Sequence, residues 1–364
     1  MGSNYRDAGV DYDVLDQAKR ETLSLARQTS SYPNYIGAKV DESSFGESAS
    51  LVDLGGQKLG FVIECLGTKS MIAKNYFDLS GEDRFFDIAY DAVAAVVNDL
   101  ICVGALPVMV NAYFATGSAD FYLEPYAGSL AKGWQAACSD AYAAWGGGES
   151  PTLAGLIEKD GVELAGSAIG KVPDDVLPLS GSRLEPGDEI VILSSSGMHT
   201  NGASLARKIA STLENSYLEQ LPSGTSFGSA LLEKSLIYVD IVRELMTETN
   251  ILHYASHITG HGIRKIMRAD RELTYRIAKL PDVPEVLRFM AECESMSDFD
   301  AYATLNMGAG FALYVKAGMG DTVCEVAASH GKEAVVAGIV EEGQKRIIVE
   351  PLDIVYDEKE LLIR

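Results

Sequence analysis

Asp99 is the residue whose position in the sequence most directly suggests chemistry. Apolar residues recur every three or four positions over 85–100, which predicts a helix over residues 82–103 with one buried stripe. The other polar residues of this helix fall opposite the stripe: Asp87, Asp91 and Asn98. Asp99 lies at the edge of the stripe, before a Gly-Ala-Leu-Pro turn at 104–107. A partly buried carboxylate is costly unless it is paired or holds a cation. Asp99 is therefore a candidate ligand, and the alternative is a helix-terminal acid bonded to the following turn.

Three more carboxylates lie beside glycines at the expected ends of helices and strands. Glu64 ends an apolar strand, Glu149 follows three glycines, and Glu47 follows Gly46. Magnesium prefers oxygen ligands and usually shares one or two carboxylates with the phosphates of a substrate. Together with Asp99, these three residues can form a magnesium site if the fold brings them close together. The alternative for each is a solvated acid in a turn.

A glycine-rich segment, Gly-Met-His-Thr-Asn-Gly at residues 197–202, joins an expected strand to an expected helix. Small residues at such a junction allow backbone N–H groups and a helix N-terminus to face an anion. The segment is therefore a candidate phosphate-binding turn, and an ordinary connecting loop is the alternative.

Three of the five histidines, His253, His257 and His261, lie within nine residues. On a helix this spacing would align them, but the segment around 258–262 predicts a strand followed by a loop. We therefore expect that the three imidazoles do not share one face. A neutral histidine near a glycine-rich loop can act as an acid or a base near pH 7. The alternative is a set of loop histidines bonded to the backbone.

Helices and strands alternate in both halves of the chain, which predicts two α/β or α+β domains, residues 1–172 and 173–364. A proline-rich segment at 172–187 connects them. Helices are expected at 13–28, 82–103, 124–145, 202–212, 229–248, 262–269, 284–292 and 320–330. Strands are expected at 59–65, 108–114, 163–171, 189–194, 254–258, 309–315 and 334–340.

The composition narrows the classes of function. The chain has 364 residues and a formal net charge of −22, which argues against binding to nucleic acids or to anionic membranes. A phosphorylated substrate remains compatible, because magnesium can bridge acidic side chains to phosphate. The five cysteines are scattered, without a CxxC pair, as in a reducing compartment. With neither a signal peptide nor a membrane span expected, the predicted location is the cytoplasm.

Taken together, these segments resemble the phosphoribosylformylglycinamidine cyclo-ligase (aminoimidazole ribonucleotide synthetase) family. The motifs follow the order of that family along nearly the whole chain. The matching segments are Tyr5–Asp11 (Y-x-D-A-G-V-D), Gly67–Lys69 (G-T-K), Val97–Leu100 (V-N-D-L), Asp99–Pro107 (D-x4-G-A-x-P), Ala115–Gly117 (A-T-G), Gly147–Glu149 (G-G-E), Ser195–Gly202 (S-S-G-x-H-x-N-G), His257–Gly260 (H-x-T-G) and Leu305–Gly310.

The resemblance implies a fold, a reaction and partners. The N-terminal mixed-sheet domain is expected to dimerise and to hold ATP and Mg²⁺ near the subunit interface. The C-terminal α/β domain is expected to close over a small ribonucleotide substrate. The implied reaction is the ATP-dependent ring closure of formylglycinamidine ribonucleotide to aminoimidazole ribonucleotide. Thiamine-monophosphate kinase and selenophosphate synthetase belong to the same superfamily, whose shared chemistry is ATP-dependent phosphorylation.

Positions that match the motifs take their expected roles from this resemblance. Glu64, Asp99, Glu149 and Glu47 are expected to hold the metal. Lys69, His199 and His257 are expected to be catalytic. The residues expected to bind ATP or substrate are Asp7, Thr68, Lys69, Asn98, Gly148, Asn201, Thr259 and Gly260.

Three departures from the family pattern keep other functions open. Glu64 replaces an Asp and follows Val-Ile instead of Gly-Thr, Thr152 replaces a second Glu, and His261 replaces a Gly. These changes lie in loops expected to contact nucleotide and substrate. One alternative is a divergent paralogue that uses ATP to phosphorylate another small substrate. The other is a non-catalytic homologue that binds the nucleotide without turnover.

Overall fold

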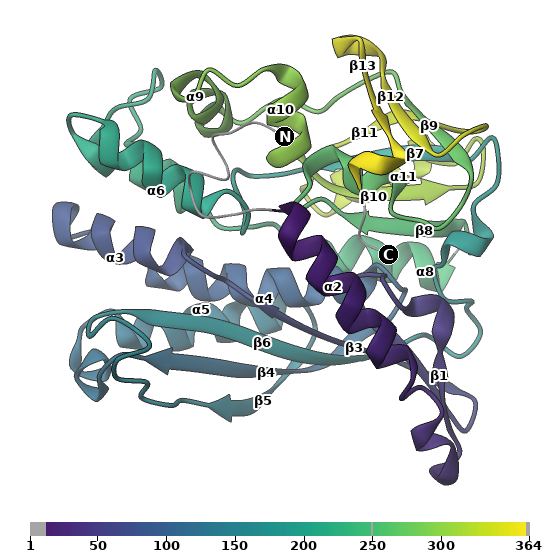
Figure 1. The fold of residues 1–364 in the computed structure, drawn as a ribbon, viewed down its shortest axis with the longest axis horizontal. Helices are drawn as coiled ribbons and strands as arrows, with labels where there is room; N and C mark the ends of the chain where they lie inside the picture. The colour runs from purple at the N-terminus through teal and green to yellow at the C-terminus, as the bar shows by residue number, and fades with distance from the viewer. Residues whose placement is uncertain (1–11, 249, 362–364) are drawn as a thin grey trace.

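The computed structural model describes residues 12–248 and 250–361, which form two sheets with helices packed against them (Figure 1). The predicted mixed α/β architecture, with one sheet in each half of the chain, is confirmed. Asp7 and the motif at residues 5–11 lie outside the described residues. Within the described ranges, every helix is too short or too polar to cross a membrane.

The first sheet has six strands, all antiparallel to their neighbours except the last pair, which is parallel. In order across the sheet, the strands are β1 (Ala38–Asp41), β2 (Ser50–Leu54), β3 (Gln57–Cys65), β6 (Val162–Lys171), β4 (Leu106–Thr116) and β5 (Ala144–Glu149). Three helices accompany this sheet: α3 (Lys69–Ser80), α4 (Phe85–Ile101) and α5 (Ala127–Asp140). Helix α4 packs on β3, β4 and β6, and α5 packs along α4 (Figure 1).

From Ile88 onward, helix α4 is buried on all sides. Asp91 and Asn98, expected opposite the apolar stripe, are only 0% and 1% exposed. Each accepts a backbone N–H from the second half of the chain: Asp91 from Ser235 at 2.6 Å, and Asn98 from Tyr238 at 3.0 Å. The apolar stripe therefore predicts only the side of α4 that faces the sheet, because the second half of the chain covers the polar side.

The second sheet has seven strands. In order, they are β13 (Ile354–Asp357), β12 (Arg346–Val349), β9 (Leu273–Ile277), β11 (Ala334–Glu342), β7 (Glu189–Ser194), β10 (Ala309–Val315) and β8 (Leu252–His257). The helices of this half are α6 (Ala203–Thr212), α7 (Phe227–Leu231), α8 (Val239–Glu248), α9 (Glu285–Cys293), α10 (Asp298–Thr304) and α11 (Gly320–Ser329). Short 3-10 helices are η1 (Tyr32–Ile36), η2 (Glu42–Ser44), η3 (Ala119–Leu123), η4 (Gly181–Arg183), η5 (Ser216–Leu218), η6 (Gly262–Met267), η7 (Glu350–Leu352) and η8 (Glu358–Glu360).

Three helix predictions need correction. The helix expected over 229–248 is interrupted between α7 and α8, because residues 235–238 run along α4 and give their backbone N–H groups to it. The helix expected over 124–145 ends at Asp140, and the glycines after it belong to β5, which pairs with β4. The segment expected as a helix at 262–269 is the 3-10 helix η6.

Helix α2 (Tyr12–Arg27) crosses from the second half of the chain to the edge of the first sheet (Figure 1). Its Asp16 is buried and lies 3.0 Å from the Nε2 atom of His261. Helix α2 thus covers the junction of the two halves, where the candidate site lies.

Candidate functional site

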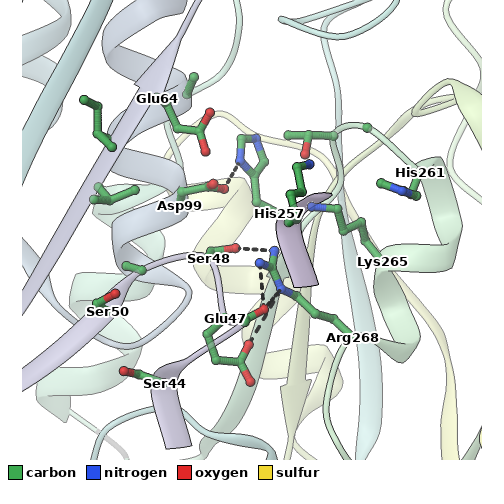
Figure 2. Close-up of a pocket in the computed structure, with 18 of the residues that line it drawn as sticks. Ser44, Glu47, Ser48, Ser50, Glu64, Asp99, His257, His261, Lys265 and Arg268 are labelled. Atoms are coloured by element: carbon green, nitrogen blue, oxygen red, sulfur yellow. Dashed lines mark hydrogen bonds and ion pairs between the residues drawn. The ribbon is translucent and has the colours of Figure 1, made fainter. Parts of the chain in front are cut away.

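A cavity of about 570 Å³ lies where α2, β3 and α4 meet the second half of the chain. The segments 44–50 and 257–268 complete its wall. Its charged or titratable lining residues include both signs of charge (Figure 2): Glu47, Glu64, Asp99, Lys19, Lys265, Arg268, His257 and His261. Both halves of the chain therefore contribute to one polar site.

Asp99, Glu64 and His257 form the centre of this site. The Oδ1 atom of Asp99 lies 2.7 Å from Nδ1 of His257. Burial opposes ionisation of Asp99, but the hydrogen bond and charge of His257 outweigh it and lower the pKa of the Asp99 carboxyl. Burial and the neighbouring Asp99 raise the pKa of Glu64 to about 8. The two carboxyl groups therefore hold one proton between them near neutral pH.

Glu47 lines the same cavity but is engaged elsewhere. Its Oε2 atom accepts a hydrogen bond of 2.7 Å from the Tyr254 hydroxyl and lies 3.8 Å from Nε of Arg268. The same guanidinium donates to the carbonyl of Gly46 and, at 2.7 Å, to the hydroxyl of Ser48 (Figure 2). Glu47 thus serves to hold the 44–50 segment against the second half.

Glu149 does not join the other predicted metal ligands within one copy of the chain. It is exposed on β5, whereas Glu64 lies on β3. Strands β6 and β4 lie between them, so the two are about 14 Å apart or more at ordinary strand spacing. Within residues 12–248 and 250–361, no group of three or more His, Cys, Asp or Glu side chains is arranged to hold a metal ion. The four carboxylates are therefore not gathered within a single copy, and their role as a metal-binding set stays a prediction.

Lys69 is placed away from the cavity. Its Nζ atom lies 2.5 Å from Oδ2 of Asp91, and both side chains are fully buried. The same ammonium donates to the carbonyl of His199 at 2.7 Å. The neighbouring Thr68 hydroxyl lies 3.4 Å from that of Ser204. In this arrangement Lys69 holds α3, α4 and the 197–202 turn together, and its expected role at a phosphoryl group stays a prediction.

His199 is a buried, neutral imidazole. Its Nε2 atom accepts backbone N–H groups from Ser196 (3.2 Å) and Leu236 (3.5 Å), so the ring proton belongs to Nδ1. Burial, followed by the charges of His257 and Lys69, lowers the pKa of His199 well below 6.5. Nδ1 has no hydrogen-bond partner in the described part of the chain. His199 therefore stays neutral in the folded chain and has an Nδ1–H without a partner among the described residues, and its catalytic role remains a prediction.

The other predicted binding residues divide into two groups. Asn201, Thr259 and Gly260 line the cavity, and the side-chain amide of Asn201 also donates to the carbonyl of Thr304. Asn98 and Gly148 do not line it. Asn98 binds the backbone of the second half. Gly148 lies in β5 with φ +158°, and a Cβ there would be 1.9 Å from the carbonyl of Ala112.

The three clustered histidines lie on a strand and the loop that follows it, as predicted, and each contacts a different carboxylate. Nδ1 of His253 lies 2.9 Å from Asp188, that of His257 contacts Asp99, and Nε2 of His261 contacts Asp16. His253 lies outside the cavity lining. Of the three, His257 is the one that contacts a carboxylate of the central cluster.

Lys265 and Arg268 belong to the site, but the sequence motifs did not single them out. They follow His261 by four and seven residues, and both side chains line the cavity. The signal that could have found them is two basic residues soon after a glycine-rich loop. Such residues stand out in a chain of net charge −22.

The chemistry of the central carboxylates fits a divalent cation. Glu64 and Asp99 are adjacent, share a proton and face a polar cavity. A metal ion that displaces this proton restores both negative charges and pairs them. Magnesium commonly uses one or two protein carboxylates and completes its shell with phosphate oxygens and water. A nucleotide phosphate chain is the kind of ligand that would complete such a shell.

Two family models match the chain. Residues 46–172 match the model described as AIR synthase related protein, N-terminal domain, and residues 185–350 match the corresponding C-terminal domain. The chain is 32% identical over 339 residues to a phosphoribosylformylglycinamidine cyclo-ligase of Methanococcus maripaludis strain C5, covering 93% of this chain and 92% of that protein. It is 29% identical to the Fusobacterium nucleatum cyclo-ligase, covering 94% and 98%.

Solved structures of more distant proteins share the fold. Hydrogenase maturation protein HypE in complex with ATP aligns with a TM-score of 0.58 at 19% identity, covering 82% of this chain and 83% of that chain. Thiamine-monophosphate kinase from Stenotrophomonas maltophilia K279a aligns with a TM-score of 0.57 at 20% identity, covering 85% and 91%.

Proposed function

This chain belongs to the AIR synthase related family, and we therefore propose that it closes the imidazole ring of aminoimidazole ribonucleotide at the expense of ATP. In this reaction the formyl oxygen of formylglycinamidine ribonucleotide attacks the γ-phosphorus of ATP, and ADP leaves. The resulting iminophosphate carries a good leaving group. The neighbouring amidine nitrogen then attacks the same carbon, phosphate leaves, and a proton is lost as the ring closes.

The observation that best supports this proposal is the Glu64–Asp99 pair in a cavity shared by both halves. Glu64 and Asp99 would hold a magnesium ion there, and the ion would offset charge on the transferred phosphoryl group. His257 keeps Asp99 ionised and oriented, and it is placed to move protons near the acceptor. Residues 1–172 would hold ATP and metal, and residues 173–364 would close over the acceptor.

Some of the remaining predicted residues line the cavity, and others lie outside it and position the residues that do. Asn201, Thr259 and Gly260 line the cavity and are placed to orient the ribonucleotide. His199 lies behind the cavity wall, close enough to His257 for its charge to act on the His199 ring. Lys69, Thr68 and Asn98 act as positioning residues that connect the two halves.

We also propose that the protein works as a homodimer through the open face of the first sheet. The strand register aligns Phe61, Ile169 and Met109 in one row across β3, β6 and β4. Their side chains are 55%, 38% and 40% exposed. A second copy would cover this apolar row. Glu149 pairs in register with Tyr113 at the same sheet, and its role as a metal ligand depends on such a second copy.

A paralogue with another acceptor is the second candidate. The observation that favours it is His261, which occupies a left-handed backbone position with φ +72° where the family has glycine. An imidazole at this position, tied to α2, changes the wall that contacts the acceptor. Such a paralogue would still transfer the γ-phosphoryl group of ATP, and Glu64 and Asp99 would have the same role as in the ring-closing reaction.

The test is the release of ADP from ATP by the full chain, with and without formylglycinamidine ribonucleotide and magnesium. We expect release that needs both, and an Asp99→Asn variant that loses it. The exposed Asp321→Asn variant on α11 is the matched control and should behave as wild type. Absence of acceptor-stimulated ADP release would contradict the ring-closing reaction. ADP release with a different acceptor would support the paralogue.

A further inference from the structure

Helix α2 lies across the junction of the two halves (Figure 1), but it buries little of its own surface. Leu23, on its inner side, lines the cavity. Among residues 14–27, Asp16 is the one buried side chain. Leu15 and Leu25 are 44% and 64% exposed. Helices on a protein surface are normally held in place by a buried apolar face. The position of α2 therefore depends largely on its polar contacts.

The N-terminal part of α2 is held by His261. Oδ2 of Asp16 lies 3.0 Å from Nε2 of His261, and the two residues are 5% and 3% exposed. The family motif has glycine at position 261, and glycine has no side chain to reach Asp16. His261 makes the contact from a left-handed backbone, with φ +72°, that residues other than glycine seldom adopt. The departure from glycine thus gives this chain a buried contact between α2 and the second half.

The contact leaves part of the Asp16 carboxylate unsatisfied. Its Oδ1 atom is buried and has no hydrogen-bond partner within the described ranges. Burial lowers the pKa of His261 and outweighs the hydrogen bond with Asp16, so the imidazole is mostly neutral at pH 7. A buried carboxylate with one unsatisfied oxygen gains little over its hydrated state. The observed position of α2 is therefore only slightly favoured over one in which Asp16 returns to water.

The two ends of α2 are attached to different halves of the chain. At the C-terminal end, the guanidinium of Arg27 lies 5.1 Å from the centre of the Phe45 ring. Just beyond it, the Ser30 hydroxyl donates to a carboxylate oxygen of Glu42 at 2.7 Å. Both partners belong to the first half, next to β1. Helix α2 can therefore pivot at the turn after Arg27 when Asp16 is released.

The loop that carries His261 is the fixed partner of this contact. The carbonyl of His261 accepts a hydrogen bond of 3.2 Å from Nε of Arg264, whose side chain is fully buried. The same guanidinium donates to the carbonyl of Ala303 on α10 and to that of Glu360 on η8. Loss of the contact between Asp16 and His261 should therefore move α2 and leave the loop in place.

We propose that α2 is a lid on the cavity, latched closed by the contact between Asp16 and His261 and hinged at the turn after Arg27. The proposal rests on the proposed function, because the ligands that pass under the lid are the nucleotide and the acceptor. Closed lids separate a reaction from bulk water, and their opening sets the rate of entry and release. Asp16 and His261 are thus positioning residues that act through α2.

Hydrogen–deuterium exchange of the ligand-free full chain tests the latch. A 16-residue helix released from its contacts is only marginally stable in water, so opening exposes its amides to exchange. The amides of α2 should exchange faster than those of α4 in wild type. His261→Gly, which suits the left-handed backbone, and Asp16→Ala, which favours the helix, should each speed α2 exchange by about tenfold or more.

Two further variants make this test specific. The double variant His261→Gly with Asp16→Ala should exchange no faster than either single variant, because both changes remove the same contact. Glu21→Ala, at an exposed acid on the same helix, is the matched control and should exchange as wild type does. An α2 that exchanges at the wild-type rate in His261→Gly would overturn the latch. So would an α2 that exchanges as slowly as α4 in wild type.

Stopped-flow binding of magnesium and an ATP analogue with an N-methylanthraniloyl group tests the lid. His261→Gly should raise both the association and the dissociation rate by about tenfold. Its affinity should change by less than about threefold, because a lid acts on entry and exit alike. Unchanged rates, or no binding to wild type, would overturn the lid, and urea unfolding of each variant separates these results from loss of the fold. The analogue binds without an acceptor, so a failure of the ring-closing reaction is read separately.

Discussion

Nδ1 of His257, on strand β8 of the second half, lies 2.7 Å from Oδ1 of Asp99, on helix α4 of the first. Both side chains are buried. The contact therefore links the ionisation of the candidate metal ligand to the packing of the two halves. A change in how the halves sit against each other would change the charge of Asp99.

Loss of this contact should weaken magnesium binding. In His257→Gln the hydrogen bond and charge that lower the pKa of Asp99 are gone. Residues that orient a metal ligand typically contribute 10- to 100-fold in metal affinity or activity, so we expect a loss of about that size. The measurement is a magnesium titration of ADP release at pH 7. His253→Gln, which breaks a histidine–carboxylate contact at the other end of β8, is the matched control. Equal effects of the two variants would contradict the role of His257.

Glu64 should make the metal-free protein less stable as the pH rises. Its pKa is raised from 4.5 to about 8 in the folded chain. The unfolded chain therefore releases this proton near pH 4.5 and the folded chain only near pH 8, so the free energy of unfolding falls through this window. Glu64→Gln removes the titration. Without magnesium, the variant should gain on the order of a few kcal/mol relative to wild type between about pH 5 and pH 8.

Urea unfolding at both pH values measures this difference. The exposed Glu158→Gln variant should show no such dependence on pH. A Glu64→Gln variant whose stability relative to wild type is the same at both pH values would show that Glu64 is ionised in the folded chain.

Lys69 should prove more important for stability than for phosphoryl transfer. Lys69→Met leaves the Asp91 carboxylate buried without its cation, which typically costs about 3–5 kcal/mol. The double variant Lys69→Met with Asp91→Asn should recover much of this loss, because the amide oxygen can still accept the N–H of Ser235. Denaturant unfolding measures both. If the double variant is stable but has lost all ADP release, Lys69 acts directly in the reaction.

The open face of the first sheet should be a contact between two copies. Ile169→Asp places a charge in the middle of the apolar row on β6 and should shift the protein to a monomer in sedimentation velocity. Val355→Asp, at a somewhat more exposed apolar position on β13, is the control and should leave the assembly unchanged. A wild-type chain that sediments as a monomer would contradict the dimer.

Local pattern accounts for much of the fold. The apolar periodicity of α4 and the apolar runs of β7, β10 and β11 predict elements close to those observed. Strands β1, β12 and β13 are only four residues long and escape prediction, because so short a segment carries little pattern. The break between α7 and α8 has no local signal, since its cause is the hydrogen bonding of residues 235–238 to α4.

Within the site, residue types and family motifs in the sequence alone point to Asp99, Glu64 and His257. For Asp99 the physical reason is local, because a carboxylate at the edge of an apolar stripe needs a partner whatever the rest of the fold. Which partner it receives depends on contacts between distant segments. In the folded chain Lys69 pairs with Asp91, and two strands separate Glu149 from Glu64. The side chain of Lys265 points toward the cavity. Charge pairing acts over a few ångströms in space, and separation along the chain says little about that distance.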